Sequence, residues 1–222
     1  MRYRILIFDL DGTLFRSFRP GLACCLDTAS TLKLEVTEGT VAMLTKYWGS
    51  PTEGLVKLCW PEACKDAHVP FQKALNRMNE TVTMPIFGGV ADALGLLREK
   101  RCVLNAYTGR NRKGADKVLV EGGIREAFTV VRCKDDVKNG KPHPEGLFRI
   151  IDPLLRVGLS PDDMLLVGDG IISDLQCAEA AGIPFLAVAE DDNTSREHFL
   201  EAGVRDDFII DSVRDLPAWL EA

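Results

Sequence analysis

The sequence has no long hydrophobic run. None of its apolar stretches approaches the roughly 18 residues that a membrane span needs, so we expect no membrane partner. The chain passes directly from its first residues into a predicted strand and shows no signal peptide pattern. Both absences favour a cytoplasmic protein.

An excess of positive charge is also lacking. The 33 Asp and Glu residues outnumber the 27 Lys and Arg residues, which gives a net charge of −6. Because nucleic acid binding depends on a basic surface, this balance disfavours a nucleic acid partner. It does not exclude an anionic substrate, since a bound divalent cation can reverse the local charge.

Cysteine motifs are missing, although the chain has seven cysteines. They form no C-x-x-C pair and stand at no zinc-binding spacing from a histidine, and the adjacent Cys24 and Cys25 are poorly placed to pair with each other. We therefore expect reduced thiols that pack as small apolar side chains in a cytoplasmic protein.

Strands and helices alternate regularly from about residue 84 onward. This pattern predicts βαβ units and hence a doubly wound, Rossmann-like parallel sheet of the α/β class. The predicted strands, including the first one, are residues 4–8, 102–107, 128–131, 164–167, 185–188 and 208–210. The predicted helices are residues 90–98, 113–120, 144–155, 174–181, 196–201 and 212–220.

Residues 20–83 show only helical periodicity, with a last helix expected over residues 69–82. A chain of 222 residues can form one large domain that carries an insertion. We therefore predict an α/β core from residues 1–15 and 86–222, with an α-helical cap domain inserted at residues 16–85.

Two carboxylates follow the first predicted strand, in the segment Asp9-Leu10-Asp11-Gly12-Thr13. Side chains at positions i and i+2 of a strand point to the same face, and open α/β sheets bind ligands at the carboxyl ends of their strands. Like charges held this close repel unless a cation or proton lies between them. The pattern favours a metal-assisted site with a carboxylate nucleophile, although a surface turn fits the same residues.

Three later segments lie at strand ends or just before a helix. They are Thr108-Gly109-Arg110, Gly140-Lys141-Pro142, and Gly168-Asp169-Gly170 with Ser173 and Asp174 just beyond. Parallel strands end at one edge of a sheet, so we expect these segments to converge with the first. Together they would supply a hydroxyl, backbone N–H groups, an ammonium group and further carboxylates.

In this order, the four segments resemble the motifs of the haloacid dehalogenase superfamily. The helical insertion is similar to the cap of its phosphoglycolate phosphatase branch. The likeness covers nearly the whole chain and includes residues 178–184, which resemble a helix-to-strand segment of the family. It implies a Mg²⁺-dependent hydrolase that cleaves a small phosphorylated metabolite through an aspartyl-phosphate intermediate.

The resemblance also implies roles for individual residues. Asp9 would be the nucleophile, and Asp11 would protonate the leaving oxygen and then activate water. Thr108 and the backbone N–H of Gly109 would hold the phosphoryl oxygens. Lys141 would neutralise charge on the nucleophile and on the phosphate.

A magnesium ligand set follows from the same resemblance. Asp169 and Asp174 would help to hold Mg²⁺, and the Asp9 carboxylate and the Leu10 backbone carbonyl would complete the shell in preference to Asp11. Hard oxygen ligands suit Mg²⁺ better than zinc. Asp174 could instead serve only as a cap for the helix that follows it.

A charge count also favours a metal. Asp9, Asp11, Asp169 and Asp174 carry four negative charges when ionised and Lys141 carries one positive charge, which leaves −3. One Mg²⁺ reduces this to −1, and a proton on Asp11 brings the sum near zero, so that a phosphate dianion is no longer repelled. We therefore expect strict metal dependence.

Two residues near the insertion bear on the substrate. Arg16 stands where many relatives have an acidic residue, and its guanidinium could bind a second anionic group such as a carboxylate; the alternative is a solvated linker residue. Trp48, in the turn at residues 47–51, could face the site or pack in the cap core.

Asp11 disfavours the dehalogenase and phosphonatase branches, which typically lack an acid at this position. By family analogy, phosphoglycolate is the leading substrate. A phosphosugar mutase and a pyrophosphatase are the alternatives. The full set of motif residues disfavours a non-catalytic binding protein with the same fold.

Overall fold

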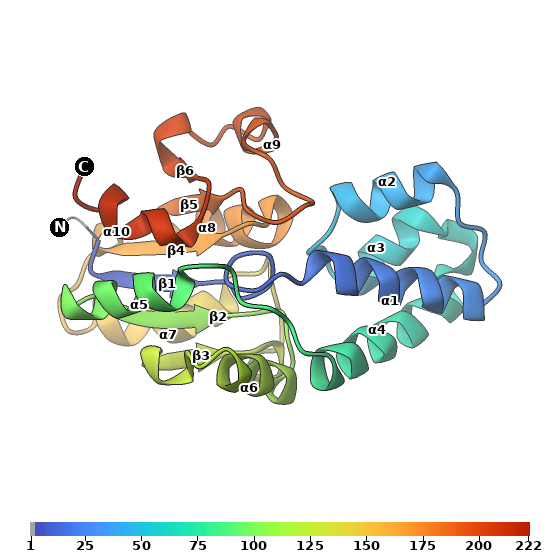
Figure 1. The fold of residues 1–222 in the computed structure, drawn as a ribbon, viewed down its shortest axis with the longest axis horizontal. Helices are drawn as coiled ribbons and strands as arrows, with labels where there is room; N and C mark the ends of the chain where they lie inside the picture. Colours follow the sequence, from blue (N-terminus) through green and yellow to red (C-terminus); the bar gives the residue numbers. More distant parts are fainter. Residues whose placement is uncertain (1–2) are drawn as a thin grey trace.

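The structure is a computed structural model that describes residues 3–222. It has two parts: a sheet with helices packed against it, and a block of helices α1–α4 beyond the carboxyl ends of the strands (Figure 1). Residues 1 and 2 of the predicted core lie outside the described residues.

Six strands form one parallel sheet in the order β3-β2-β1-β4-β5-β6. The chain adds β2 and β3 on one side of β1, and β4, β5 and β6 on the other, so the strand order reverses at β1. The predicted doubly wound α/β fold is therefore confirmed. The strands are β1 (Ile5–Phe8), β2 (Val103–Tyr107), β3 (Val130–Arg132), β4 (Met164–Gly168), β5 (Phe185–Val188) and β6 (Ile209–Ile210).

Both faces of the sheet are buried, as is usual for parallel strands. On β1, Leu6 and Phe8 belong to one apolar cluster, whereas Ile5 and Ile7 belong to another. Helices α5, α6 and α10 cover the first cluster, and α7, α8 and α9 cover the second. Their bounds are α5 (Val90–Glu99), α6 (Arg112–Glu121), α7 (Glu145–Leu155), α8 (Gln176–Ala181), α9 (Arg196–Glu201) and α10 (Leu216–Trp219).

The helical block has an apolar cluster of its own, in which the Trp60 and Phe71 rings pack at a centroid distance of 5.1 Å. The block consists of α1 (Phe18–Thr31), α2 (Glu38–Lys46), α3 (Thr52–Cys59) and α4 (Cys64–Thr81). Short 3₁₀ turns lie at Pro61–Ala63, Arg125–Ala127, Lys134–Asp136, Pro161–Asp163, Asp206–Phe208 and Val213–Asp215.

Two neighbouring chain segments connect the helical block to the sheet domain. The backbone N–H of Arg16 donates to the Pro85 carbonyl at 2.8 Å, and that of Phe87 donates to the Leu14 carbonyl at 3.0 Å. The chain therefore leaves and re-enters the sheet domain at one place. The cap boundaries at residues 16 and 85 stay a prediction.

Three predicted helices have clearly different starting points. The helix predicted over residues 212–220 begins only at Leu216, after the 3₁₀ turn Val213–Asp215. Helix α4 begins at Cys64 rather than at residue 69, because the turn Pro61–Ala63 leads directly into it and the helix continues through Pro70. The helix predicted from residue 174 begins only at Gln176. It follows a π-helical turn over Ile171–Leu175, in which the N–H groups of Asp174 and Leu175 both donate to Gly170.

In the described part of the chain, no helix is both long and apolar enough to span a membrane. The seven cysteines are free thiols. Burial raises the pKa of Cys25, Cys133 and Cys177 to about 12, which suits a packing role for these three side chains. The cytoplasmic location stays a prediction.

Candidate active site

The point where the strand order reverses places two acidic segments next to each other. In the pairing of β1 with β4, Phe8 lies beside Val167, and the N–H of Asp9 donates to the Val167 carbonyl at 2.9 Å. Asp169 follows at the end of β4. Crevices at such reversal points are the usual ligand sites of open α/β sheets, so the topology itself brings the first and last predicted motifs together.

Lys141 joins this pair of segments to a third one. Its Nζ lies 2.6 Å from Asp9 Oδ1 and 2.6 Å from Asp174 Oδ1, and it sits 5.0 Å from the centre of the Tyr107 ring. The Lys141 side chain is only 5% exposed. Two ionised partners raise its pKa despite burial, so the ammonium is a permanent positive charge in the site.

Asp169 is held by the first segment rather than by Lys141. Its Oδ1 accepts a hydrogen bond from the Thr13 hydroxyl at 2.9 Å. Gly12 adopts a φ of +75°, and a Cβ at this position would overlap the Asp169 carboxylate. The Gly-Thr pair after the first strand is therefore explained by the space and the donor that Asp169 requires.

Asp174 is fully buried within the π-helical turn. Its Oδ2 accepts from the Gly170 N–H at 3.0 Å and from the Ser173 hydroxyl at 3.3 Å. These bonds run back toward the strand, and Asp174 makes no capping bond to α8. The alternative in which Asp174 only caps the following helix is therefore not what the structure shows.

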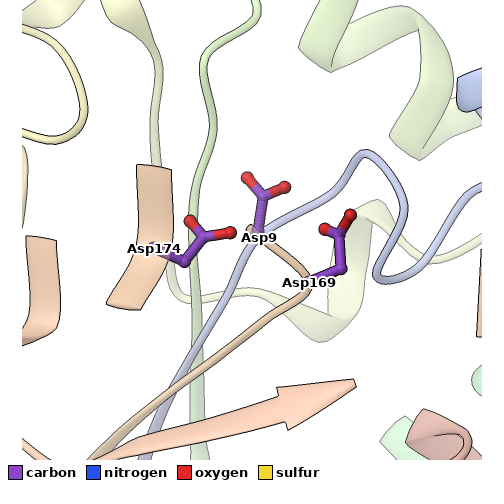
Figure 2. A group of neighbouring side chains, drawn as sticks. All are labelled: Asp9, Asp169 and Asp174. Atoms are coloured by element: carbon purple, nitrogen blue, oxygen red, sulfur yellow. The ribbon is translucent and has the colours of Figure 1, made fainter. Parts of the chain in front are cut away.

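Asp9, Asp169 and Asp174 form the acidic cluster of the site. Figure 2 shows their side chains projecting from neighbouring segments toward a shared space, and each offers one oxygen within 4.8 Å of the others. Burial raises the pKa of Asp9 to about 7, against the lowering effect of Lys141. Burial, followed by the charge of Asp9, holds the pKa of Asp169 well above its usual value. Three crowded, desolvated carboxylates fit a hard divalent cation.

Asp11 lies apart from this cluster because Arg110 binds it. Arg110 Nε donates to Asp11 Oδ2 at 2.8 Å, and Nη2 donates to Oδ1 at 2.5 Å. The motif Thr108-Gly109-Arg110 was recognised in the sequence, but its arginine received no role. The sequence did offer a signal for Arg110, because this arginine directly follows the end of a strand that we expected to border the site. With Arg110 counted, the formal charge of the site is −2 rather than −3, which one Mg²⁺ would neutralise.

Thr108 and Gly109 lie at the end of β2, where they were expected. The Thr108 side chain is buried, and its hydroxyl accepts from the Arg110 N–H at 3.1 Å. Gly109 lines the cavity described below. The hydroxyl thus shapes the turn, and Gly109 and Arg110 are the residues of this motif that line the cavity.

The Leu10 carbonyl does not fit its expected role as a metal ligand. It accepts hydrogen bonds from the N–H groups of Leu14 at 2.9 Å and Phe15 at 3.0 Å, which close the turn after the first strand. Both lone pairs of this oxygen are therefore engaged. The resemblance that suggested this carbonyl could not foresee its engagement, because the geometry of the turn decides which carbonyls are free.

A cavity of about 850 Å³ lies between the sheet edge and the helical block. Asp9, Lys141 and Asp169 lie at its core wall, and α3, α4 and the turn around Trp48 supply the opposite wall. The two walls approach each other at Gly49, where an added Cβ would come within 3.3 Å of Ser173 Oγ.

Trp48 combines the two roles considered for it. Its ring packs edge-on against Phe18 at 5.5 Å, and it also lines the cavity. Arg16 lies elsewhere: its guanidinium stacks on the Phe87 ring at 4.6 Å, and it borders a separate small pocket with Asp191 and Asp192. The structure does not bring Arg16 to the acidic cluster, and this position fits the linker alternative.

The family model of the haloacid dehalogenase-like hydrolases matches residues 6–188. The chain belongs to this family. Phosphoglycolate phosphatase of Salmonella typhi is 31% identical over 237 residues, covering 96% of this chain and 90% of the relative. That of Escherichia coli (strain K12) is 30% identical over 238 residues, with the same coverage. The predicted enzyme class, a phosphatase of the haloacid dehalogenase type, is confirmed.

Solved structures of this family share the fold. A haloacid dehalogenase-like family protein of Streptococcus pneumoniae has a TM-score of 0.78 and 18% identity, covering 98% of both chains. A predicted phosphoglycolate phosphatase of Haemophilus somnus has a TM-score of 0.76 and 21% identity, covering 97% of both chains. At these identities the likeness establishes the fold and leaves the substrate open.

Proposed function

We propose that this phosphatase hydrolyses a small phosphomonoester in a Mg²⁺-dependent reaction that passes through an aspartyl-phosphate on Asp9. The single observation that carries the proposal is the environment of the Asp9 carboxylate. It is buried, bound to Lys141 at 2.6 Å, and close to two further carboxylates at the edge of a cavity. Such a carboxylate has a cationic neighbour, a metal-binding environment and access to a ligand.

Mg²⁺ would be held by Asp9 and Asp169, with Asp174 as the third carboxylate of the cluster. Since the Leu10 carbonyl is engaged in the turn, the backbone of Asp11 is the better candidate for a carbonyl ligand. When bound, the ion would supply positive charge at the phosphoryl oxygens and reduce their repulsion by the acidic cluster.

The residues of the chain provide the remaining chemistry. An oxygen of Asp9 attacks phosphorus, the bond between phosphorus and the ester oxygen breaks, and Asp11 gives its proton to the departing oxygen. Asp11 then takes a proton from water, which attacks the same phosphorus and releases phosphate from Asp9. Lys141 stays positive throughout and balances charge on Asp9 and the phosphoryl group. The Gly109 backbone lines the space beside that group.

Phosphoglycolate is the leading substrate candidate, supported by the names of the two relatives and by the cations of the cavity. Lys134 is a candidate partner for a substrate carboxylate, because this cation lines the cavity and its Nζ donates to Asn76 Oδ1 of the cap at 2.5 Å. This residue replaces Arg16 in the hypothesis of a second anion site. The cavity volume of about 850 Å³ also admits larger leaving groups, including phosphosugars.

Phosphate release from para-nitrophenyl phosphate, with and without Mg²⁺, tests the proposed reaction. We expect turnover that depends on the metal and disappears in Asp9→Asn. Undiminished turnover by Asp9→Asn, or after chelation, would contradict the proposal. Product analysis on phosphosugars separates a hydrolase, which releases phosphate, from a mutase, which returns an isomeric phosphosugar. Inorganic pyrophosphate belongs in the same panel as the third alternative.

A further inference from the structure

Arg110 is the most deeply buried cation that borders the cavity without touching the acidic cluster. It is 1% exposed, whereas the Asp11 side chain that it binds is 26% exposed. Each oxygen of the Asp11 carboxylate accepts one bond from the guanidinium, from Nε and from Nη2. This two-bond geometry fixes the orientation of a carboxylate as well as its position.

Arg110 is anchored from both sides of the cavity, through its backbone on the core side and through its guanidinium on the cap side. On the core side, the N–H of Arg110 donates to Thr108 Oγ1 at 3.1 Å, and the Arg110 carbonyl accepts from the Lys134 N–H at 3.0 Å. On the cap side, Nη1 donates to the Asn79 carbonyl of α4 at 3.4 Å. Arg110 therefore links the place of Asp11 to the end of β2 and to the cap.

We propose that Arg110 is the positioning residue of Asp11 and determines where the acid–base carboxyl stands at the cavity edge. The inference rests on the proposed function, because it assigns to Arg110 an effect that is exerted through Asp11. A solvent-exposed carboxylate without this partner has several rotamers of similar energy, and most of them would not face the leaving oxygen. When Asp11 carries a proton, one of its oxygens can still accept from the guanidinium, so the acid form keeps its position.

Two substrates with different leaving groups can distinguish a positioning role of Arg110 from a purely structural role. Para-nitrophenolate leaves without protonation, whereas the alkoxide of glycerol phosphate requires a proton as the ester bond breaks. In Arg110→Gln, we expect kcat/KM for glycerol phosphate to fall about 100-fold, as for the loss of general acid catalysis. For para-nitrophenyl phosphate we expect a loss of less than about fivefold. Arg112→Gln removes a nearby arginine that pairs with Asp136 instead, and should leave the ratio of the two values unchanged.

A double-mutant cycle completes the test. If Arg110 acts through Asp11, the substitution Arg110→Gln should have little further effect on glycerol phosphate in the Asp11→Asn background. Arg110→Lys keeps the charge but not the paired geometry, and should show an intermediate loss. It serves as the test variant if Arg110→Gln does not fold, as judged by circular dichroism and thermal melting.

Three results would overturn the inference: equal losses on both esters, an undiminished loss in the Asp11→Asn background, or faster turnover of glycerol phosphate by Arg110→Gln. A failure of the proposed function looks different. In that case the wild-type protein releases no phosphate from either ester, or Asp9→Asn retains its turnover.

Discussion

The two walls of the cavity differ in how their polar groups are held. On the core wall, Asp9, Asp169 and Asp174 are buried, and Lys141 balances two of them at 2.6 Å. On the cap wall, amide groups and apolar side chains of α4 alternate, and Gln72 Nε2 donates to Asn76 Oδ1 at 3.1 Å. One wall fixes buried charges at high desolvation cost, whereas the other presents amide groups and exposed charges such as Lys73 that can exchange partners with water.

We infer from this difference that the core wall carries out the reaction and the cap wall recognises the leaving group. Charged groups that must meet a reacting phosphorus gain from fixed positions in a region of low dielectric constant. Groups that only recognise a leaving group need less rigidity, and helices of an inserted domain can vary without disturbing the sheet edge. Substitutions in the acidic cluster or at Lys141 should therefore abolish turnover, and substitutions on the cap wall should shift preference among substrates.

The largest expected effect is at the nucleophile. Asp9→Asn keeps the shape of the side chain but removes the oxygen nucleophile, so kcat for para-nitrophenyl phosphate should fall on the order of 10⁴-fold or more. Phosphate release under saturating Mg²⁺ measures this loss, with circular dichroism as the control for folding. If Asp9→Asn and the cap variant Asn76→Ala lost similar amounts of activity, the contrast between the two walls would be wrong.

Metal removal should produce the next effect. Chelation should abolish turnover, and added Mg²⁺ should restore it, because the acidic cluster otherwise repels the substrate. Binding should also raise the free energy of unfolding, by about 2.7 kcal/mol at a ligand concentration of 100 times Kd. Thermal melting with and without Mg²⁺ measures this gain, which Asp169→Asn should reduce. A gain of equal size in Asp169→Asn would place the ion elsewhere.

The sheet and the core of the site followed from the sequence because both depend on local rules. Short apolar runs that alternate with amphipathic helices define a parallel sheet. The ends of β1 and β4 fix where Asp9 and Asp169 lie, and the loop before α7 carries Lys141 to them. The glycine of the first motif also has a local cause, since its backbone adopts a φ of +75°, which L residues rarely adopt.

The features that could not be predicted from the sequence depend on contacts between distant residues or on turn geometry. The bonds from Arg110 to Asp11 join positions 99 residues apart, and no periodicity marks them. The engagement of the Leu10 carbonyl follows from the turn that places Leu14 and Phe15 beneath it. The orientation of Arg16 toward Phe87 depends on how the two linkers pair. Turn geometry and contacts between distant segments decide these positions.

A smaller effect is expected at the second anion site. Lys134→Met should lower kcat/KM for phosphoglycolate about 10-fold, equivalent to about 1.4 kcal/mol, because a partly buried charge-assisted hydrogen bond is lost. A neutral ester such as para-nitrophenyl phosphate should lose much less. Arg16→Ala is the matched control, since this cation lies on Phe87 and should affect both esters equally. If Arg16→Ala instead lowered kcat/KM for phosphoglycolate but not for para-nitrophenyl phosphate, the second anion site would lie at Arg16 in the linker.

The smallest effect concerns the loop that carries Lys141. Glu145 accepts from the N–H groups of Asn139 at 2.9 Å and Lys138 at 3.1 Å and from Arg149 at 2.9 Å. These bonds, the one to Asn139 first, lower the pKa of Glu145 to about 2. A lowered pKa means that the folded state binds the proton less readily than the unfolded state. The stabilisation is therefore present above the unfolded value of roughly 4.3 and is lost as the pH falls toward 2.

Thermal melting of the wild-type protein and Glu145→Gln across this range measures the contribution. We expect a slightly higher Tm for the wild type at pH 7, and a difference that closes as the pH falls from about 4.3 toward 2, because protonation then removes the same acceptor that the substitution removes. Arg149→Gln takes away only the side-chain partner and should leave part of the difference in place. A Tm difference that stayed constant across the range would mean that the charge of Glu145 does not stabilise the loop of Lys141. Fixed charges would then contribute less to the stability of the core wall than we infer.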